Sequence, residues 1–386
     1  MKIAYILNSS DMFGGASKSF MALLQGVIKA GHEAMVVLPD AGPLKEVLDK
    51  LKVETHVLTY RPNLYPYDES LKDYILWIPR LLARRFVNGK AVRQLCGMLE
   101  GYDIVHTNVS VIDIGQRAAS QCNIPHVYHF REYGDLDFGY RYFPSKSRFM
   151  KTVDWSICIT RGIQQHHALC DNRKSVVIYN GIRPRLAQMP EQDGKEEKYV
   201  LFAGRLEPAK GCEMAIEAFC KANLSACLKI AGESLNEMYL SGLKRIVEKY
   251  NMVDRVQFLG AVDNVQELMR NAVATIVASK FEGFGRVAAE AMFSGCIVVG
   301  RNTGGTMEQF NNGLRYTGGE IGFRFITVNE LVQCLRSIFR MPDEKLYDVR
   351  QRAFRTVNNF YTTEASVESV INFYNIIKND GSAENH

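Results

Sequence analysis

The sequence predicts an α/β protein with two Rossmann-like domains, each built on a doubly wound parallel sheet. Its 386 residues exceed what a single hydrophobic core usually holds. Short strand-like runs alternate with stretches of helical period from end to end, without hairpin signals between them. The alternation breaks only at 183–198, a polar segment with two prolines. We therefore expect a first domain over 1–182, a linker over 183–198, a second domain over 199–360 and a C-terminal helix over 361–386.

The expected strands are runs rich in β-branched and aromatic residues. The first domain has such runs at 2–8, 33–39, 53–59, 103–108, 126–130, 155–160 and 175–180. The second domain has them at 198–204, 227–232, 256–260, 274–279 and 296–300. Segments of helical period lie between them, for example at 18–31, 212–222 and 236–250.

Composition indicates an ordinary globular protein, with 47% hydrophobic and 23% charged residues and a net charge of +5. The nine cysteines form no C-x-x-C pair and are odd in number, which favours reduced thiols. The start MKIAYILNSS is typical of a first strand rather than of a signal peptide. No run approaches the roughly 18 apolar residues of a membrane-spanning helix. We expect a cytoplasmic protein that at most rests on the inner face of the cell membrane.

Two strand-to-helix turns have the chemistry of an anion site. In doubly wound sheets, ligands bind beyond the carboxyl ends of the strands, where such turns gather. Gly14 and Gly15 precede the first helix and would bare its N–H groups, although a tight turn alone explains them better. Arg205 and Lys210 flank a helix start, where the dipole normally favours acidic residues. An anion between these cations, above all a diphosphate, explains their placement better than a solvated loop.

The stretch KFEGFGRVAAEAMFSGCIVVG places two carboxylates around a glycine-rich turn. Glu282 follows a predicted strand, Gly283, Phe284 and Gly285 form a bend, and Glu290 lies inside the next helix. Taken alone, Glu290 is best explained as an exposed helix position. If it is buried it needs donors, which the two hydroxyls of a ribose would supply. Glu282 is harder to explain without a ligand, because it stands in a bend at the end of a strand.

A further glycine pair follows the strand expected at 296–300. Gly304 and Gly305 precede Glu308, which again sets a flexible backbone beside a carboxylate at a helix start. The helix dipole stabilises Glu308 there in any case, so the functional weight of this turn is modest.

Together these turns resemble those of the family 4 glycosyltransferases of GT-B fold. The matching pieces occur in the family's order: GGA near the N-terminus, GH at 31–32, DIVHTN, the His of HVYHF, IYNGI, GRLEPAKG, EGFGRVAAEAMFSG and GGTME. They span almost the whole chain, and GRL-x-x-x-KG followed by the spaced glutamates is a specific pairing. The resemblance implies two Rossmann-like domains that face each other across a cleft, with the final helix crossing back to the first domain.

The resemblance also implies roles for individual residues. Arg205 and Lys210 would hold the diphosphate of a nucleotide sugar, Glu290 its ribose, and Glu282 would lie by the donor sugar near the reacting centre. The remaining donor contacts would come from Gly283, from the amides of Phe284 and Gly285, and from Gly14 and Gly15 of the opposite domain. His129 would approach the sugar as the second catalytic residue. Candidate contacts to the acceptor or sugar are Arg131, Asn180, Gly304, Gly305 and Glu308.

The activity that the resemblance implies is a metal-independent transfer of a hexose-type sugar, with retention at the anomeric carbon. The donor would be a UDP- or GDP-type nucleotide sugar, and no cofactor is expected. The acceptor would be a glycan or a lipid-linked molecule, in surface polysaccharide or glycoconjugate biosynthesis. The chain departs from the family at Arg183, where an Asp is usual, and at Asn108, where a second His is common. Both departures bear on the acceptor rather than on the activity.

One tripeptide matches a metal motif but not its setting. Asp135-Leu136-Asp137 spells the D-x-D of another glycosyltransferase architecture, where it ends an apolar strand. Here it stands in a polar and aromatic stretch, so we attribute the match to chance. No other spacing indicates a metal site.

Two other function classes are compatible with parts of this pattern. A nucleotide-sugar epimerase of the same two-domain plan would share the diphosphate site but consume no acceptor. A sugar-binding protein of periplasmic type would share the architecture, although the start of the chain and the paired cations argue against it.

A basic and apolar segment in the first domain could contact a membrane. Between Lys72 and Arg93 it carries six cations and one carboxylate, Asp73. Trp77, Leu81, Leu82 and Phe86 are interleaved with the charges. The pattern is typical of a helix on an anionic membrane, where a lipid-linked acceptor would be found. A solvated basic helix that covers the sheet explains it equally well. Nucleic acid is not an expected partner, since no recognised binding module accompanies the segment.

Overall fold

The computed structural model describes residues 1–12, 14–65, 71–191 and 198–383. The chain divides into two compact units. Unit 1 comprises Met1–Gly181 together with Thr363–His386, and unit 2 comprises Ile182–Thr362. Residues 192–197, in the predicted linker, lie outside the described residues.

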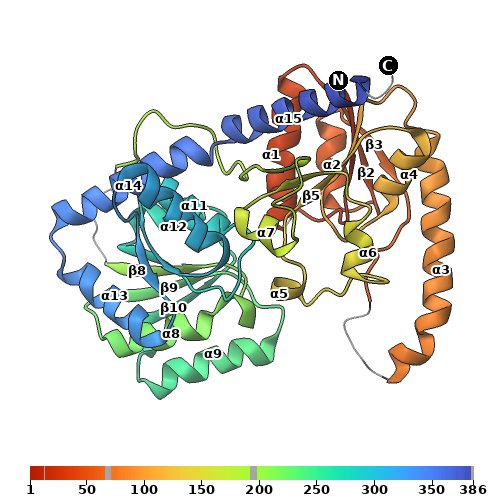
Figure 1. Ribbon diagram of the computed structural model, residues 1–386. Coiled ribbons are helices and arrows are strands. Elements are labelled where there is room, and N and C mark those ends of the chain that lie inside the picture. The colour runs from red at the N-terminus through yellow and green to blue at the C-terminus, as the bar shows by residue number, and fades with distance from the viewer. Residues whose placement is uncertain (13, 66–70, 192–197, 384–386) are drawn as a thin grey trace. The chain divides into compact units, whose positions relative to one another are not determined.

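Unit 1 is a single parallel sheet covered by helices on both faces (Figure 1). Its strands are β1 (Lys2–Ile6), β2 (Glu33–Leu38), β3 (Glu54–Val57), β4 (Ile104–Thr107), β5 (His126–Phe130), β6 (Trp155–Cys158) and β7 (Ser175–Val177). Its helices are α1 (Gly15–Lys29), α2 (Pro43–Lys50), α3 (Leu71–Cys96), α4 (Ile114–Cys122), α5 (Asp135–Phe138), α6 (Lys146–Met150), α7 (Arg161–His166) and α15 (Thr363–Ala383).

The strand order of unit 1 is β3-β2-β1-β4-β5-β6-β7. The order reverses between β1 and β4, which pair in parallel from Ile3 with Ile104 to Ile6 with Thr107. Such a reversal is the switch point beside which doubly wound sheets bind ligands, at the carboxyl ends of the strands. One core, under α1, α2 and α15, includes Tyr5, Phe20 and Tyr374, and a second core, under α3 and α4, includes Met35 and Leu95.

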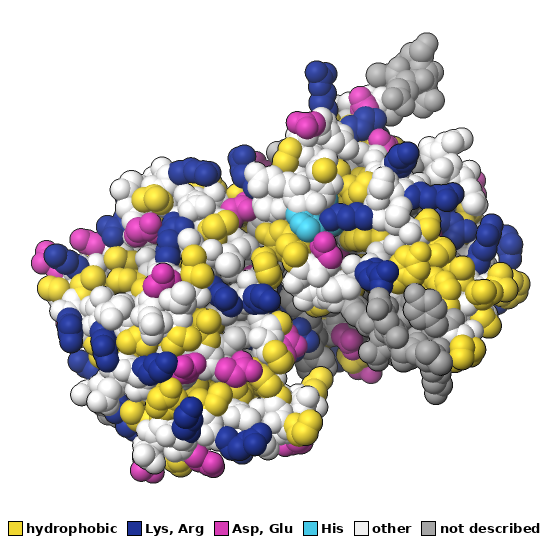
Figure 2. Space-filling model, turned by 60° about the horizontal axis from the view of Figure 1, so that its bottom comes forward, with side chains coloured by type: hydrophobic (Ala, Val, Ile, Leu, Met, Phe, Trp, Pro, Cys, Tyr) yellow, Lys and Arg dark blue, Asp and Glu magenta, His cyan; other side chains and the backbone are white. Residues whose placement is uncertain are grey.

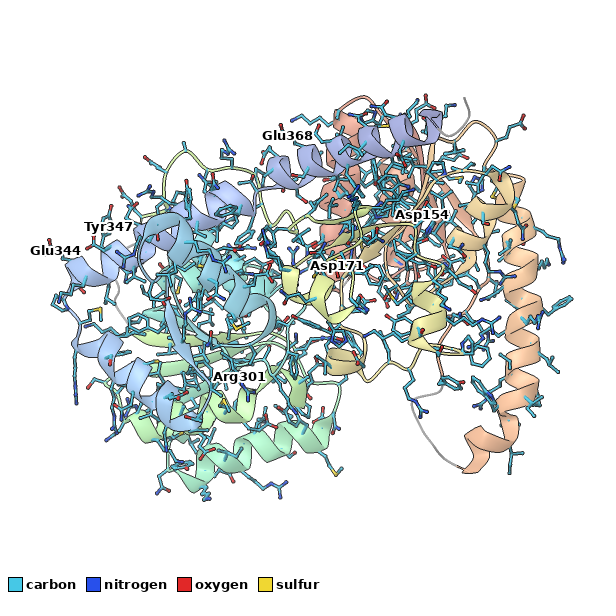
Figure 3. The ribbon with its side chains drawn as sticks, in the orientation of Figure 1. Asp154, Asp171, Arg301, Glu344, Tyr347 and Glu368 are labelled. Carbon is cyan, nitrogen blue, oxygen red and sulfur yellow. The ribbon has the colours of Figure 1, made fainter. Side chains whose placement is uncertain are left out.

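The last helix, α15, packs on unit 1 beside α1 (Figure 1). It buries Val367, Val370, Tyr374 and Ile377, which recur at intervals of three and four residues, as on one face of an α-helix. Glu368, labelled in Figure 3, lies on its exposed side. A side chain at Gly26 of α1 would overlap Val367, so glycine there lets the two helices approach closely.

Helix α3 changes character along its length. Its second half covers the sheet with Ala91, Val92 and Leu95. Its first half exposes four apolar side chains spaced by three and four residues, which we call the apolar stripe: Ile75, Ile78, Leu82 and Phe86, each at least 63% exposed. Yellow and dark blue side chains gather side by side where α3 lies, at the right-hand edge of Figure 2.

The structure separates the apolar residues that the sequence grouped on this segment. Trp77 and Leu81 lie half-buried, and the Trp77 ring stacks on Tyr65 with 5.0 Å between ring centroids. They therefore do not belong to the apolar stripe, whereas Leu82 and Phe86 do. The side chains of Lys72 and Asp73 lie outside the described part of the chain.

Unit 2 is a second parallel sheet flanked by helices (Figure 1). Its strands are β8 (Tyr199–Ala203), β9 (Cys227–Ala231), β10 (Val256–Gly260), β11 (Ala274–Val277), β12 (Ile297–Arg301) and β13 (Phe323–Phe325). Its helices are η1 (Pro208–Lys210), α8 (Cys212–Ala222), α9 (Glu237–Lys249), η2 (Val253–Arg255), α10 (Val265–Asn271), α11 (Arg286–Phe293), α12 (Gly304–Thr317), α13 (Val328–Arg340) and α14 (Asp343–Phe360).

The strand order of unit 2 is β10-β9-β8-β11-β12-β13, and neighbouring strands pair in parallel. Its core lies on the side of α8, α9 and α13, with Phe202, Phe219 and Leu335 at its centre. The predicted fold class, two doubly wound parallel sheets, is confirmed. β13, three residues long, was not among the predicted strands.

The described part of the predicted linker is tied to unit 2. Arg183 forms a parallel bridge with Thr362, and Leu186 exchanges two hydrogen bonds with the side chain of Asn358 on α14. Ile182 also donates its amide to the carbonyl of Tyr361. The segment up to residue 191 therefore lies with unit 2, and the division falls between Gly181 and Ile182. Within the residues described, no helix is both long and apolar enough to cross a membrane.

Candidate active site

Four loops meet at the carboxyl edge of the unit 2 sheet, and glycines let their backbones touch. Gly232, after β9, has a φ of +150° and lies against the carbonyl oxygen of Gly204, after β8. Gly211 has a φ of +71° and lies against the carbonyl oxygen of Ala278, after β11. A side chain at either position would overlap that oxygen, and a positive φ is itself unfavourable for other residues. The loops are thereby held in one arrangement.

Lys210 and Glu282 form an ion pair at this edge. Lys210 ends η1, and its Nζ lies 2.7 Å from Oε1 of Glu282, in the turn after β11. The hydroxyl of Ser279 donates to the same oxygen over 2.6 Å. Both contacts engage Oε1, so neither occupies Oε2 of Glu282. The two charged side chains are 25% and 19% exposed, which keeps them reachable from solvent. The sequence analysis had placed these residues in the same site, but not in contact.

A small pocket opens beside this pair. The last residues of β8 and β11 line it, together with Lys210, Glu282 and Val287. Arg205 does not line it: its side chain is 64% exposed and pairs with Glu207 over 3.2 Å. The structure therefore brings Lys210 and Glu282 together, while Arg205 points to a partner on its own loop.

The turn after Glu282 is fixed from behind by the start of α12. The amide of Gly305 donates to the carbonyl of Glu282 over 2.8 Å. The side-chain amide of Gln309 donates to the carbonyls of Phe284 and Gly285, over 2.6 and 3.1 Å. Gly285 itself has a φ of +84° and begins α11. These contacts use the carbonyls of the turn and set its conformation.

Gly304 and Gly305 have a structural reason to be glycine. A side chain at Gly304 would come within 2.6 Å of the carbonyl oxygen of Glu282, and one at Gly305 would overlap the backbone of Phe284. Their closeness to the Glu282 turn is by itself enough to require glycine here. Glu308 lies half-buried one turn further along α12.

Glu290 is neither fully exposed nor without donors. It lies on α11 with 18% of its side chain exposed, and its Oε1 accepts from Nη2 of Arg286 over 3.0 Å. Burial lowers the pKa of Arg183. The charge of Glu290 opposes this effect, because it is near enough to favour the charged form of Arg183. The cation at Arg183, where the family usually has an Asp, therefore lies close to the carboxylate expected to bind ribose.

In unit 1, Gly14 and Gly15 begin α1 after β1. A side chain at Gly14 would meet only Ser17, at 3.9 Å, so packing among the described residues does not require glycine at this position. Among the described residues, Gly14 therefore has open space beside it, in contrast to Gly304 and Gly305.

The other site residues of unit 1 form one buried hydrogen-bonded group at the end of β5. Arg131 donates to Asn180 over 2.7 Å and to Asn108 over 2.9 Å, and its Nη2 lies 3.3 Å from Nδ1 of His129. His106 of β4 contributes its Nε2, 3.2 Å from the same nitrogen of His129. Three of the residues predicted for the site, His129, Arg131 and Asn180, are therefore brought together, and Asn108 joins them.

These contacts determine which nitrogen of His129 carries the proton. Arginine only donates hydrogen bonds, so Nδ1 of His129 must accept, and the neutral ring then carries its hydrogen on Nε2. Burial, together with the charge of Arg131, holds the pKa of His129 well below its usual value, so the ring is neutral. Nε2 has no partner among the residues described. His129 thus has a buried hydrogen-bond donor at Nε2 and does not act as a base through that nitrogen.

The helix α15 supports this arrangement from behind. The hydroxyl of Tyr374 lies 2.6 Å from Nδ1 of His106, which in turn contacts His129. Because Nε2 of His106 donates to His129, Nδ1 of His106 accepts from Tyr374. His106 is therefore satisfied by its neighbours, and Tyr374 was not among the residues predicted for the site.

Both carboxylates of the D-x-D tripeptide have structural contacts. Asp137 caps α5 by accepting from the amides of Tyr133 and Gly134, and Asp135 lies 2.5 Å from Nε2 of His166.

Arg301, labelled in Figure 3, ends β12 at the edge where the site lies, and its Nε is buried with no partner within the described ranges. A cation at a strand's carboxyl end was the signal that could have singled out Arg301.

Two family models match the chain in succession. The model "Glycosyltransferase Family 4" matches residues 13–186, and the model "Glycosyl transferases group 1" matches residues 187–353. Together they cover both units and every predicted site residue. The chain is a GT-B glycosyltransferase. The recognition of the family from its motifs is confirmed, as is the prediction of a transferase.

Named relatives agree with this membership. An uncharacterized glycosyltransferase of Methanocaldococcus jannaschii is 28% identical over 80% of this chain and 82% of its own length. The N-acetyl-alpha-D-glucosaminyl L-malate synthase of Bacillus anthracis is 25% identical over 56% of this chain and 58% of its own. The crystal structure of Anabaena HepE in complex with UDP and glucose has a TM-score of 0.75, covers 96% of this chain and 98% of its own, and is 20% identical. None of these three is named as an epimerase.

Proposed function

We propose that this glycosyltransferase moves a hexose-type sugar from a nucleotide diphosphate sugar to a glycan or lipid-linked acceptor, with retention at the anomeric carbon. The observation that carries the proposal is the Lys210–Glu282 pair, joined by Ser279, beside a pocket at the carboxyl edge of the unit 2 sheet. A structural neighbour crystallised with UDP and glucose supports a nucleotide-sugar donor. The acceptor class and a place in surface polysaccharide or glycoconjugate biosynthesis are part of the proposal.

Lys210 has the central role in this mechanism. Breaking the bond between sugar and diphosphate leaves an oxocarbenium-like sugar and negative charge on the phosphate. The ammonium of Lys210 and the amides of Phe284 and Gly285, at the start of α11, would stabilise that charge as it develops. No metal ion or cofactor enters this proposal. Arg205 would have to leave Glu207 in order to join Lys210 on the diphosphate.

The other residues would position the donor. Binding of the diphosphate to Lys210 would release Glu282 from its ion pair, so that its carboxylate could accept hydroxyls of the sugar. Glu290 would bind the ribose, and Arg286 would hold that carboxylate in place. His129 would donate from Nε2 to an oxygen of the sugar, in a position set by Arg131 and His106.

A thermal-shift panel tests the donor class. Ligands stabilise the folded state by an amount that grows with the logarithm of their saturation, about 2.7 kcal/mol at a hundredfold excess over Kd. We expect UDP or GDP to raise the melting temperature clearly more than inorganic pyrophosphate at the same concentration, because the nucleoside adds contacts at Glu290. If no nucleotide exceeds pyrophosphate, the proposed donor site is wrong.

We also propose that the apolar stripe of α3 rests on an anionic membrane surface. Charge complementarity supports this occupant, since Arg85 and Lys90 flank the stripe and Arg93 follows it on the same helix. Such a surface would bring the enzyme to an acceptor carried by a lipid. The protein would then lie on the cytoplasmic face as a peripheral enzyme.

Liposome flotation tests the membrane contact. We expect phosphatidylglycerol vesicles to carry the protein upward at low salt, and L82S/F86S to reduce binding at least about tenfold, because two apolar side chains no longer enter the lipid. The control L51S/I376S changes two exposed apolar residues of unit 1 outside the stripe. Equal flotation of the two double variants, or none of the wild type, would rule out the stripe as the contact.

A further inference from the structure

Unit 1 contains a groove distinct from the group around His129. It lies between α3, the start of α4, and the segment from Phe143 to Thr152 that includes α6. We call it the basic groove, because four arginines line it: Arg84, Arg85, Arg117 and Arg148. The lining segments follow β3, β4 and β5, so the groove lies at the carboxyl edge of the sheet, where doubly wound folds bind ligands.

Arg84 makes this groove unlike a chance collection of surface charges. It is only 9% exposed, and its Nη1 donates to the carbonyl of Leu64 over 2.8 Å. Its guanidinium lies 4.8 Å from the ring centre of Phe143 and 5.6 Å from that of Trp77. Its Nη2, however, has no hydrogen-bond partner in the described part of the chain. A buried donor without a partner is costly, which an anionic ligand would remedy.

The charges around Arg84 favour the same kind of ligand. The carboxylate that lines the groove is Asp113, whose pKa is raised by burial, and it lies 3.8 Å from Nη1 of Arg117. Arg148 is exposed on α6. The N-terminus of α4 adds its own partial positive charge at Asp113, whose side chain makes no capping hydrogen bond. Among the described residues, the groove therefore has an excess of fixed positive charge.

The remaining lining is apolar. Leu81 and Leu82 of α3 line the groove together with Phe143, Pro144 and Phe149. An inorganic anion alone would leave these side chains unused, whereas a phosphate ester on a hydrocarbon chain would contact both kinds of lining. Leu82 also belongs to the apolar stripe, so the groove continues toward the surface proposed to contact lipid.

We propose that the basic groove binds the phosphate or diphosphate group of a lipid-linked acceptor, with the first part of the hydrocarbon chain along its apolar side. This inference rests on the proposed transfer to such an acceptor and assigns it a site. Arg84, Arg117 and Arg148 would hold the phosphate oxygens. The saccharide that accepts the new sugar would extend from the phosphate along the carboxyl edge of the unit 1 sheet.

Calorimetric titration with farnesyl diphosphate tests the groove. We expect the wild type to bind it, and R117Q/R148Q to bind it at least about tenfold more weakly, because two charge-assisted contacts are lost. The control K50Q/R173Q removes two cations from other exposed parts of unit 1 and should bind like the wild type. Inorganic pyrophosphate and farnesol, each with half of the ligand's chemistry, should both bind more weakly than farnesyl diphosphate.

Three results would overturn the proposal. In the first, K210A abolishes binding of farnesyl diphosphate and R117Q/R148Q leaves it unchanged. The ligand would then occupy unit 2. Another is weaker flotation of R117Q/R148Q on phosphatidylglycerol vesicles with unchanged farnesyl diphosphate affinity, because the arginines would then serve lipid headgroups. The third is no binding by the wild type. The nucleotide thermal shift should persist in R117Q/R148Q, so failure of the groove is distinguishable from failure of the donor site.

Discussion

Replacing Lys210 with alanine is expected to lower kcat/KM by about 10² to 10³. The ammonium lies 2.7 Å from Glu282, and both line the pocket proposed to bind the donor, where negative charge would develop on the leaving diphosphate. The same variant should bind the preferred nucleoside diphosphate at least about tenfold more weakly, because one charge-assisted contact is lost. Calorimetric titration and initial rates measure the two effects separately.

A matched pair of variants makes this result specific. E282Q should also lose activity but should keep nucleoside diphosphate affinity within about threefold, because the carboxylate of Glu282 is assigned to the transferred sugar, which a nucleoside diphosphate lacks. K221A removes an exposed lysine that pairs with Glu217 on α8, away from the pocket, and should resemble the wild type. If K210A binds the nucleotide as tightly as K221A does, Lys210 does not hold the diphosphate.

Gly305→Ala is expected to reduce activity through the backbone rather than through a lost contact. The added methyl group would overlap the backbone of Phe284, so the turn that carries Glu282 must shift. A displacement of about 1 Å at a reacting centre can lower the rate about a hundredfold. Overpacking should also reduce the free energy of unfolding by about 1–3 kcal/mol. Thermal unfolding and initial rates together test this expectation.

Gly242→Ala is the control for Gly305→Ala. Gly242 lies within α9, and a side chain there would meet nothing within 4 Å. Alanine has the higher helix propensity, so this variant should be neutral or more stable by up to about 1 kcal/mol. A Gly305→Ala protein with wild-type stability and activity would show that the turn tolerates the methyl group and that the packing account is wrong.

The architecture was predictable because parallel strands and their helices leave strong local patterns. Every strand of unit 1 lies in a run that the sequence marked. Buried strands such as β1 and β2 are nearly continuous apolar stretches. In unit 2, β13 was not marked. The loop motifs around Lys210 and Glu282 were found because glycines and charges at the ends of strands are visible in sequence.

Contacts between distant residues were not predictable. The ion pair of Lys210 with Glu282 depends on how two loops pack, and those loops lie 72 positions apart. The support of His106 by Tyr374 joins residues 268 positions apart, and nothing in the local sequence of α15 indicates it. The ion pair of Glu290 with Arg286 is a local contact, because the two residues lie one helical turn apart. Their spacing of four residues could have indicated this pair from sequence.

The glycines near the site show why residue type alone leaves a role open. Gly305 is required by the close backbone of Phe284, whereas the described neighbours of Gly14 leave space for a side chain. In sequence both occur as pairs ahead of a helix and look alike. Only the three-dimensional structure distinguishes a glycine that packing requires from one that is free to contact a ligand.

The most direct test of the account is a crystal structure of the protein with UDP or GDP bound. The account predicts a diphosphate oxygen within about 3.2 Å of Nζ of Lys210, at the carboxyl edge of the unit 2 sheet, with the Lys210–Glu282 ion pair opened or shared. A diphosphate bound elsewhere, with Lys210 still paired to Glu282 alone, would contradict it.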